Sequence, residues 1–206
     1  MKGLVIIGAS GHGKVAADIA AKIGYEKIVF LDDNYLIKDC LYYPVVGSVK
    51  DAREYMGFDF FVAVGDGKTR KIIQEDLIKE GCNIVSLFHP EATISSFVNI
   101  GVGTIVVAGA VINSGTIIGS GCIVNTSSSI DHDCRIGNYS HVAVGAHLAG
   151  GVEVGSGSWI GAGAIINNQV FICENCMIGA GAVVIHNIEI PGTYMGIPAK
   201  RKQGEL

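Results

Sequence analysis

One aliphatic residue recurs at every sixth position through the second half of this 206-residue chain. The series runs from Ile94 to Ile190, seventeen residues of Ile, Val or Leu without a slip, and the residue four positions after each is mostly small. This period is typical of a parallel β-helix, in which each hexapeptide forms one short side and one turn of a coil. With three sides a coil takes about eighteen residues, so the pattern predicts a triangular prism with the aliphatic and the small residues inside.

The first half of the chain follows a different pattern, in which apolar strands alternate with amphipathic helices. We expect strands over 4–8, 27–33, 60–66 and 83–88, helices over 13–24 and 68–81 that end at Gly24 and Gly81, and a short helix over 49–55. This order predicts a small Rossmann-like α/β domain with a parallel sheet. The expected fold is therefore α/β plus all-β, with domains 1–88 and 89–206.

Charge and hydropathy narrow the possible partners. The formal net charge of −4 offers no basic surface for nucleic acid. Gly, Asn and Ser interrupt the apolar residues every few positions, so no run reaches the ~18 needed to span a bilayer. The N-terminal apolar run is too short for a secretory signal. We therefore expect a cytoplasmic protein that binds small molecules, with no nucleic-acid or membrane partner.

The segment GASGHGKV at residues 8–15 comes close to the Gly-x-x-x-x-Gly-Lys-[Ser/Thr] loop of nucleotide hydrolases. Its last residue is Val15, which has no hydroxyl for Mg²⁺, and no later strand offers an obvious second metal carboxylate. A hydrolase is therefore disfavoured. A glycine-rich turn that leaves a strand and opens a helix still presents backbone N–H groups and a positive helix end to an anion.

Polar residues follow the predicted strands at their carboxyl ends, where open α/β sheets bind ligands. Asp32 and Asp33 close the second strand about twenty residues after the glycine loop, where such folds bind a ribose or a base. This arrangement predicts a nucleotide site; the alternative is that the aspartates start a turn and the glycines only pack closely. The expected site residues are Gly8, Ser10, Gly11, His12, Gly13, Asp32, Asp33, Gly65 and Arg70.

Ionisable residues replace the small turn residues in one hexad, IDHDCR, where His132 lies between Asp131 and Asp133. A neighbouring carboxylate raises the basicity of an imidazole and fixes its tautomer, as a general base requires. Moving eighteen residues along the chain moves one coil along the prism, so His132 should lie beside Gly150, whose open N–H suits an oxyanion. The alternative is that the aspartates cap a turn and His132 is an ordinary surface residue.

Two further histidines, His141 and His147, each precede an aliphatic of the repeat and are expected to project outward, in a polar cluster with His132. Three histidines could form a metal site. Ligands on stacked coils would have residue numbers that differ by eighteen, and no pair of these histidines does, so we expect no metal. Cys173 and Cys176 form a C-x-x-C. The repeat places Cys176 inside and Cys173 outside, so we expect them to face opposite ways, without a zinc or redox role.

Several segments together resemble a known family. The loop IGASGHG, the segments FLDD and VGDGKTRKII, the hexads NTSSSIDHDCRIGNYSHVAVGAHLAG and the tail GIPAKR are similar to those of the bacterial nucleotide-sugar and sialic acid acetyltransferases. The resemblance covers nearly the whole chain. It implies that the prism is a left-handed β-helix of hexapeptide repeats, that acetyl-CoA is the co-substrate, and that the protein is a homotrimer with active sites between neighbouring prisms.

The resemblance also implies roles at the acetyl-transfer site. His132 matches a general base that takes a proton from the 4-amino group of a UDP-linked sugar. Its acidic partner Asp133 stands where the family has a glutamate, one methylene longer. His141 matches a second active-site histidine, and Gly150 matches a glycine whose N–H meets the thioester carbonyl. The resemblance thus implies acetyl-CoA contacts from His141 and Gly150.

Nucleotide and coenzyme phosphates have expected partners on the same basis. In the tail, Lys200 and Arg201 are expected near the CoA phosphates. Two alternatives stay open for the function: O-acetylation of sialic acid or another surface-polysaccharide sugar, and a non-catalytic nucleotide-sugar-binding scaffold. The nucleotide contacts that the resemblance implies are Ser10, Gly11 and His12 at the diphosphate, and Asp32 and Arg70 near the uridine.

Overall fold

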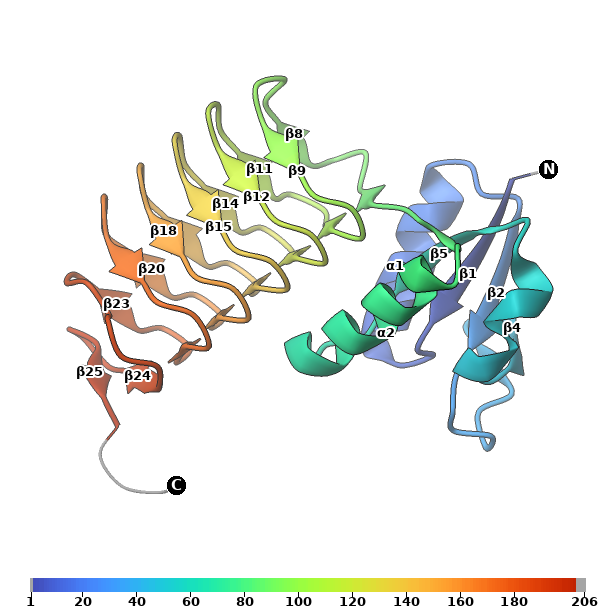
Figure 1. Ribbon diagram of the computed structural model, residues 1–206. Helices are drawn as coiled ribbons and strands as arrows, with labels where there is room; N and C mark the ends of the chain where they lie inside the picture. Colours follow the sequence, from blue (N-terminus) through green and yellow to red (C-terminus); the bar gives the residue numbers. More distant parts are fainter. Residues whose placement is uncertain (1, 203–206) are drawn as a thin grey trace. The chain divides into compact units, whose positions relative to one another are not determined.

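The computed structural model describes residues 2–202, and the chain divides into two compact units, Met1–Pro90 and Glu91–Leu206 (Figure 1). Each unit has a hydrophobic core of its own. The first unit is a mixed helix and sheet structure, and the second is a coil of short parallel strands.

A six-stranded sheet forms the centre of the first unit, in the order β3-β4-β2-β1-β5-β6. All its strands are parallel except β3, which forms an antiparallel hairpin with β4. The strands are β1 (Gly3–Ile7), β2 (Lys27–Leu31), β3 (Asp39–Cys40), β4 (Tyr43–Gly47), β5 (Asp59–Val62) and β6 (Asn83–Ile84), and the helices are α1 (Gly11–Lys22), the 3-10 helix η1 (Val49–Tyr55) and α2 (Gly67–Lys79).

The sequence explains why this sheet is buried on both faces. All five residues of β1 are apolar or Gly and all are buried, as expected for a central parallel strand. The chain leaves β1 through α1 toward β2, and leaves β5 through α2 in the opposite direction. Right-handed crossovers therefore place α1 and α2 on opposite faces. The carboxyl ends of β1 and β2 lie side by side and bring the glycine loop next to Asp32.

Two details of this unit differ from the prediction. The segment 83–88 is not one strand: β6 ends at Ile84, and β7 (Leu87–Phe88) is a separate strand. The β3–β4 hairpin was not predicted. Residues in β4 are only half-buried or exposed, and Pro44 lies within it, so the segment lacks the apolar run that marks the other strands.

The second unit is a three-sided prism, as the six-residue period predicts (Figure 1). Face one contains β10 (Ile105–Val106), β13 (Ile123–Val124), β16 (His141–Val142), β19 (Trp159–Ile160) and β22 (Met177–Ile178). Face two contains β8 (Thr93–Ile94), β11 (Val111–Ile112), β14 (Ser129–Ile130), β17 (His147–Leu148), β20 (Ile165–Ile166) and β23 (Val183–Val184). Face three contains β9 (Asn99–Ile100), β12 (Ile117–Ile118), β15 (Arg135–Ile136), β18 (Glu153–Val154) and β21 (Phe171–Ile172). The C-terminal strands β24 (Thr193–Met195) and β25 (Lys200–Arg201) extend face one.

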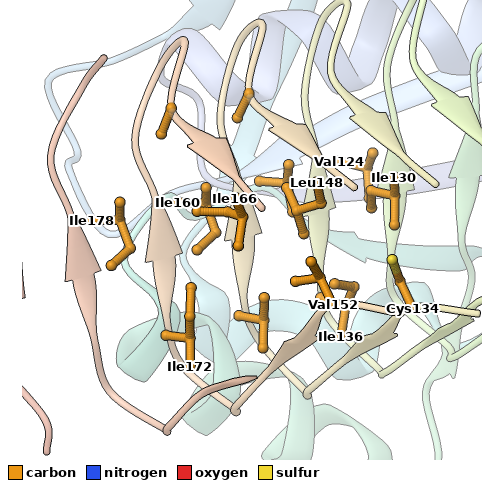
Figure 2. Close-up of a cluster of buried hydrophobic side chains, with 14 of the residues drawn as sticks. Val124, Ile130, Cys134, Ile136, Leu148, Val152, Ile160, Ile166, Ile172 and Ile178 are labelled. Atoms are coloured by element: carbon orange, nitrogen blue, oxygen red, sulfur yellow. The ribbon is translucent and has the colours of Figure 1, made fainter. Parts of the chain in front are cut away.

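Successive coils pair in parallel with the expected eighteen-residue register, for example Ile130 with Leu148. Aliphatic side chains from all three faces meet inside the prism, where Figure 2 shows Ile130, Ile136, Leu148 and Ile160 in one continuous core. The small residues four positions on are buried too, including Ser140, and several donate to a carbonyl of the next coil. Both inward positions of the repeat are therefore confirmed.

The repeat ends earlier than its spacing suggests. Ile190, the last aliphatic of the series, is 56 % exposed and lies in no strand, so its expected inward position is wrong. Ile188 is buried instead and forms an isolated bridge with Ile172. The expectation that Cys173 and Cys176 face opposite ways is also wrong, because their Sγ atoms are 3.4 Å apart. Both exceptions occur where no further regular coil follows.

The break in the repeat can be measured with two identical substitutions. Ile172→Ala removes a fully buried side chain and should lower the free energy of unfolding by about 2–5 kcal/mol. Ile190→Ala, eighteen residues later, should cost less than about 1 kcal/mol because that side chain is mostly exposed. Urea denaturation of both variants checks the difference, and equal losses would show that Ile190 belongs to the core.

Candidate active site

His132 lies in the turn between β14 and β15, at the corner where faces two and three meet. Asp133 has a φ of 59°, in the left-handed region that glycine occupies at the matching position of most hexapeptides and that aspartate tolerates. Its Oδ2 is 2.8 Å from Nδ1 of His132. On the other side, the His132 N–H donates to Oδ1 of Asp131 at 2.8 Å. The histidine is therefore held between two carboxylates, one on its ring and one on its backbone.

These carboxylates set the acid–base properties of the ring. The hydrogen bond with Asp133, followed by the negative charge of Asp131, raises the pKa of His132. Asp131 itself has a lowered pKa, because Asn113 donates a hydrogen bond to it at 2.8 Å and His132 donates its N–H. If Nδ1 carries the proton shared with Asp133, Nε2 is the free basic atom. That atom faces Gly150.

Gly150 leaves room for the imidazole, as the eighteen-residue register predicts. A Cβ atom at this position would lie 2.6 Å from Nε2 of His132, so any side chain would displace the ring. Among residues 2–202, none accepts a hydrogen bond from the Gly150 N–H. A basic nitrogen and an open N–H donor therefore lie side by side. They border a groove of about 440 Å³ that is lined by Asp131, His132, Asp133, Ala149, Gly150, Gly151, Asn168 and Gln169.

A second groove of about 240 Å³ adjoins the first and shares Asp131 and Ala149 with it. It crosses face two, where Oγ of Ser129 is 2.8 Å from Nδ1 of His147. The prediction named His132 and Asp133 but assigned no site role to Asn113. The signal was available, since Asn113 precedes Asp131 by one coil of eighteen residues.

His141 lies on a different side of the prism. It belongs to β16 on face one, which does not touch the corner that carries His132. The side chain is 8 % exposed: its ring centroid lies 4.1 Å from that of Trp159, and Nε2 is 3.1 Å from Nδ2 of Asn125. The prediction that the three histidines form one cluster is therefore wrong within one chain. His147 adjoins the His132 groove, and His141 does not.

The glycine loop of the first unit connects β1 to α1 as predicted. Gly8 has a φ of 100°, which favours glycine, and a Cβ at Gly13 would collide with the Gly8 carbonyl. Ser10 is the N-cap residue of α1, and Gly11 begins the helix. Asp32 ties the loop to β2, since its Oδ2 accepts the Ala9 N–H at 2.7 Å. The N-terminal end of a twelve-residue helix thus opens from a tightly built turn.

Two predicted nucleotide residues differ in burial: Arg70 is buried and His12 is half-buried. Arg70 is 1 % exposed, and its guanidinium donates to the carbonyls of Val64 and Gly65 at 2.7 and 2.8 Å. It therefore supports the loop that contains Gly65. Burial, and next the nearby charge of Arg70, lowers the pKa of His12 to about 4. The His12 ring is uncharged at neutral pH, and its buried Nε2 has no hydrogen-bond partner within residues 2–202.

A groove of about 310 Å³ lies at the carboxyl ends of β2 and β4. Asp32 and Asp33 line it, and Oδ1 of Asp33 accepts the Val49 N–H at 3.0 Å. The prediction missed its other members because it missed the β3–β4 hairpin that supplies several of them. They are Tyr35, Ile37, Lys38, Val45, Val46, Gly47 and Ser48.

The predicted coenzyme residues of the tail lie on the surface. Lys200 and Arg201 form β25 and are exposed, and Arg201 donates to the Pro191 carbonyl at 3.1 Å. In the described part of the chain, no three His, Cys, Asp or Glu side chains form a group that could hold a metal ion. No helix among the same residues is long and apolar enough to cross a membrane.

The acid–base character of His132 can be tested by NMR. Asp133→Ala should lower the pKa of the imidazole, because the hydrogen bond with Asp133 is the main cause of its raised pKa. Asp131→Ala should lower that pKa by a smaller amount, since this carboxylate acts only through its charge. A ¹⁵N-detected titration of the ring nitrogens in all three proteins measures the order. A wild-type pKa at or below the ordinary histidine value would contradict this account.

Known proteins share both halves of this structure. Residues 3–77 match the model of the PglD N-terminal domain family. UDP-N-acetylbacillosamine N-acetyltransferase of Bacillus subtilis (strain 168) is 34 % identical over 113 residues, which are 52 % of this chain and 52 % of that protein, so the match spans about half the length of that curated relative.

Solved structures match over nearly the full length. The acetyltransferase domain of PglB from Neisseria gonorrhoeae FA1090 in complex with acetyl coenzyme A is 39 % identical, with a TM-score of 0.94 over 98 % of this chain and 99 % of that one. PerB from Caulobacter crescentus in complex with CoA and GDP-perosamine is 35 % identical, with a TM-score of 0.93 over 98 % of each chain. The chain therefore belongs to the bacterial hexapeptide-repeat nucleotide-sugar N-acetyltransferases, which join a PglD-type N-terminal domain to a β-helix.

Proposed function

We propose that this protein transfers an acetyl group from acetyl-CoA to the 4-amino group of a UDP-linked amino sugar, with His132 as the general base. The observation that carries the proposal is the pairing of a carboxylate-oriented imidazole with an open backbone N–H in one groove. Solved relatives support the class of reaction, since one holds acetyl coenzyme A and another holds CoA with GDP-perosamine.

The chemistry follows from the positions of these two groups. Nε2 of His132 accepts a proton from the sugar amine as the amine nitrogen attacks the thioester carbonyl. The Gly150 N–H donates to the oxygen that becomes negative in the tetrahedral intermediate. Asp133 stabilises the imidazolium that forms, and the CoA thiolate leaves. The two substrates react directly, so no acetylated enzyme is required.

The first unit supports binding of a nucleotide diphosphate. The N-terminus of α1 offers backbone N–H groups and a positive dipole to the phosphates, with Ser10, Gly11 and His12 nearest to it. Asp33 has one carboxylate oxygen engaged with the Val49 N–H. Its other oxygen can accept a hydrogen bond from the single N–H of uracil. Guanine presents two N–H donors and would need both carboxylate oxygens free. We therefore propose UDP as the nucleotide.

The active enzyme is proposed to be a cytoplasmic homotrimer. Within one chain, His132 and His141 lie on opposite parts of the triangular prism. A neighbouring prism that packs face one against the corner of His132 would supply the second histidine. Edge-rich β structures commonly assemble with copies of themselves, and closed ring symmetry would repeat the same contact three times. Each site would then draw residues from two subunits.

The base and the acceptor can be tested together. His132→Ala should lower kcat by about 10²–10⁴-fold while acetyl-CoA binding is retained, because only proton removal is lost. In the wild type, kcat/KM should rise with pH as the imidazole loses its proton, and Asp133→Ala should move that rise to lower pH.

The acceptor is tested by measuring thiol release with UDP- and GDP-4-amino sugars and with sialic acid. Turnover of sialic acid alone would exclude N-acetylation, and preference for GDP would exclude uridine recognition.

Subunit sharing predicts complementation between two inactive proteins. A mixture of His132→Ala and His141→Ala chains should recover activity at about a quarter of the sites, those that combine the intact corner of one chain with the intact face of another. A mixture of His132→Ala and Asp133→Ala should show no more activity than the two proteins measured apart, since both changes affect the same corner. Native mass spectrometry verifies that mixed trimers form. No recovery in their presence would show that each chain builds its site alone.

A further inference from the structure

At the first position of the turns from face three to face one, only the last coil of the prism has a side chain. The turns from face three to face one begin with Gly101, Gly119, Gly137 and Gly155, and then with Cys173. A Cβ at Gly155 would lie 2.6 Å from the carbonyl carbon of Cys173, so the backbone of the next coil excludes a side chain there. Cys173 escapes this constraint because the regular repeat stops after its coil.

The inward residues of the same turns form a ladder of hydrogen bonds. Each donates to a carbonyl one coil further on, at 2.9 Å for Thr104, 3.1 Å for Cys122, 3.1 Å for Ser140 and 3.0 Å for Ser158. Cys176 is the last member, and its Sγ is 4.0 Å from the nearest such carbonyl oxygen. The missing coil thus weakens this bond, and the Sγ of Cys176 lies 3.4 Å from the Sγ of Cys173 instead.

The two thiols differ in access and in acidity. Cys173 is half-buried and reaches solvent, whereas Cys176 is 2 % exposed. Burial, and next the hydrogen bond with Cys173, raises the pKa of Cys176 to about 12. Cys176 therefore keeps its proton at neutral pH, and a reagent from solvent meets Cys173 first. Asn175, with a φ of 55°, closes the tight turn that holds the two residues together.

We propose that Cys173 and Cys176 are a reversible dithiol–disulfide site that reacts with small disulfides. The thiolate of Cys173 attacks one sulfur of the small disulfide, whose S–S bond breaks and releases one thiol. Cys176 then attacks the Cys173 sulfur as its proton passes to the departing thiolate, which leaves as the second thiol. The protein loses two electrons and two protons, and the small disulfide gains them. The two sulfur atoms are 3.4 Å apart and must approach to the S–S bond length of about 2.05 Å.

Glutathione disulfide is the probe that tests this site in the full-length protein. After incubation, intact mass spectrometry should show the loss of two hydrogens without an adduct, and peptide mapping should link Cys173 to Cys176. Dithiothreitol should reverse the change. Cys176→Ser should hold one glutathionyl group on Cys173, because the resolving thiol is gone, and Cys173→Ser should not react at this turn.

Cys122→Ser is the matched control, because Cys122 fills the same inward position with an ordinary carbonyl partner. It should behave as the wild type does. Two results would overturn the proposal: a glutathionyl adduct that persists on Cys173 of the wild type, or no reaction at either residue while a reference peptide thiol is oxidised. Both readouts are independent of acetyl transfer, so they stand whether or not the proposed function holds.

Discussion

Parallel hydrogen bonding between coils eighteen residues apart fixes every neighbour in the prism. The bonds that surround the candidate base belong to this ladder: the Asp131 N–H donates to the Leu148 carbonyl at 3.0 Å, and the Gly151 N–H donates to the His132 carbonyl at 2.9 Å. Side chains at one corner therefore receive their partners from the main chain. His132 meets Gly150 for this reason. The pair reaches solvent, but the hydrogen-bonded backbone beneath it holds the two residues in place.

Absence of a side chain has two different causes in this structure. At Gly155 the backbone of the next coil would collide with any Cβ, so glycine there is a requirement of stacking. At Gly150 the nearest atoms belong to the imidazole of His132, so glycine there makes room for a functional ring. The same residue type thus serves the fold at one corner and the site at another. A repeat pattern alone does not separate the two, because it records only that the position is glycine.

Sequence reasoning succeeded wherever a position is determined by the repeat. The inward residues follow from the six-residue period, and the contact of His132 with Gly150 follows from the eighteen residues that make one coil. It failed where the repeat stops, at Ile190 and Cys173, because a residue at the end of a stack lacks the neighbour that the rule assumes. In the first unit it identified the loop but not the hairpin beside it. Whether a single charge such as Arg70 is buried depends on packing that no local pattern encodes.

The two units set the protonation state of a histidine in different ways. At the β-helix corner, carboxylates surround an exposed histidine and favour its charged form, which suits a group that must accept a proton. At the glycine loop, burial and the charge of Arg70 keep His12 neutral. A diphosphate held there would meet backbone N–H groups, the helix dipole and a neutral imidazole in place of an imidazolium. Because these groups do not titrate near neutrality, acidification that protonates His132 should slow the proton-accepting step and leave the nucleotide loop unaltered.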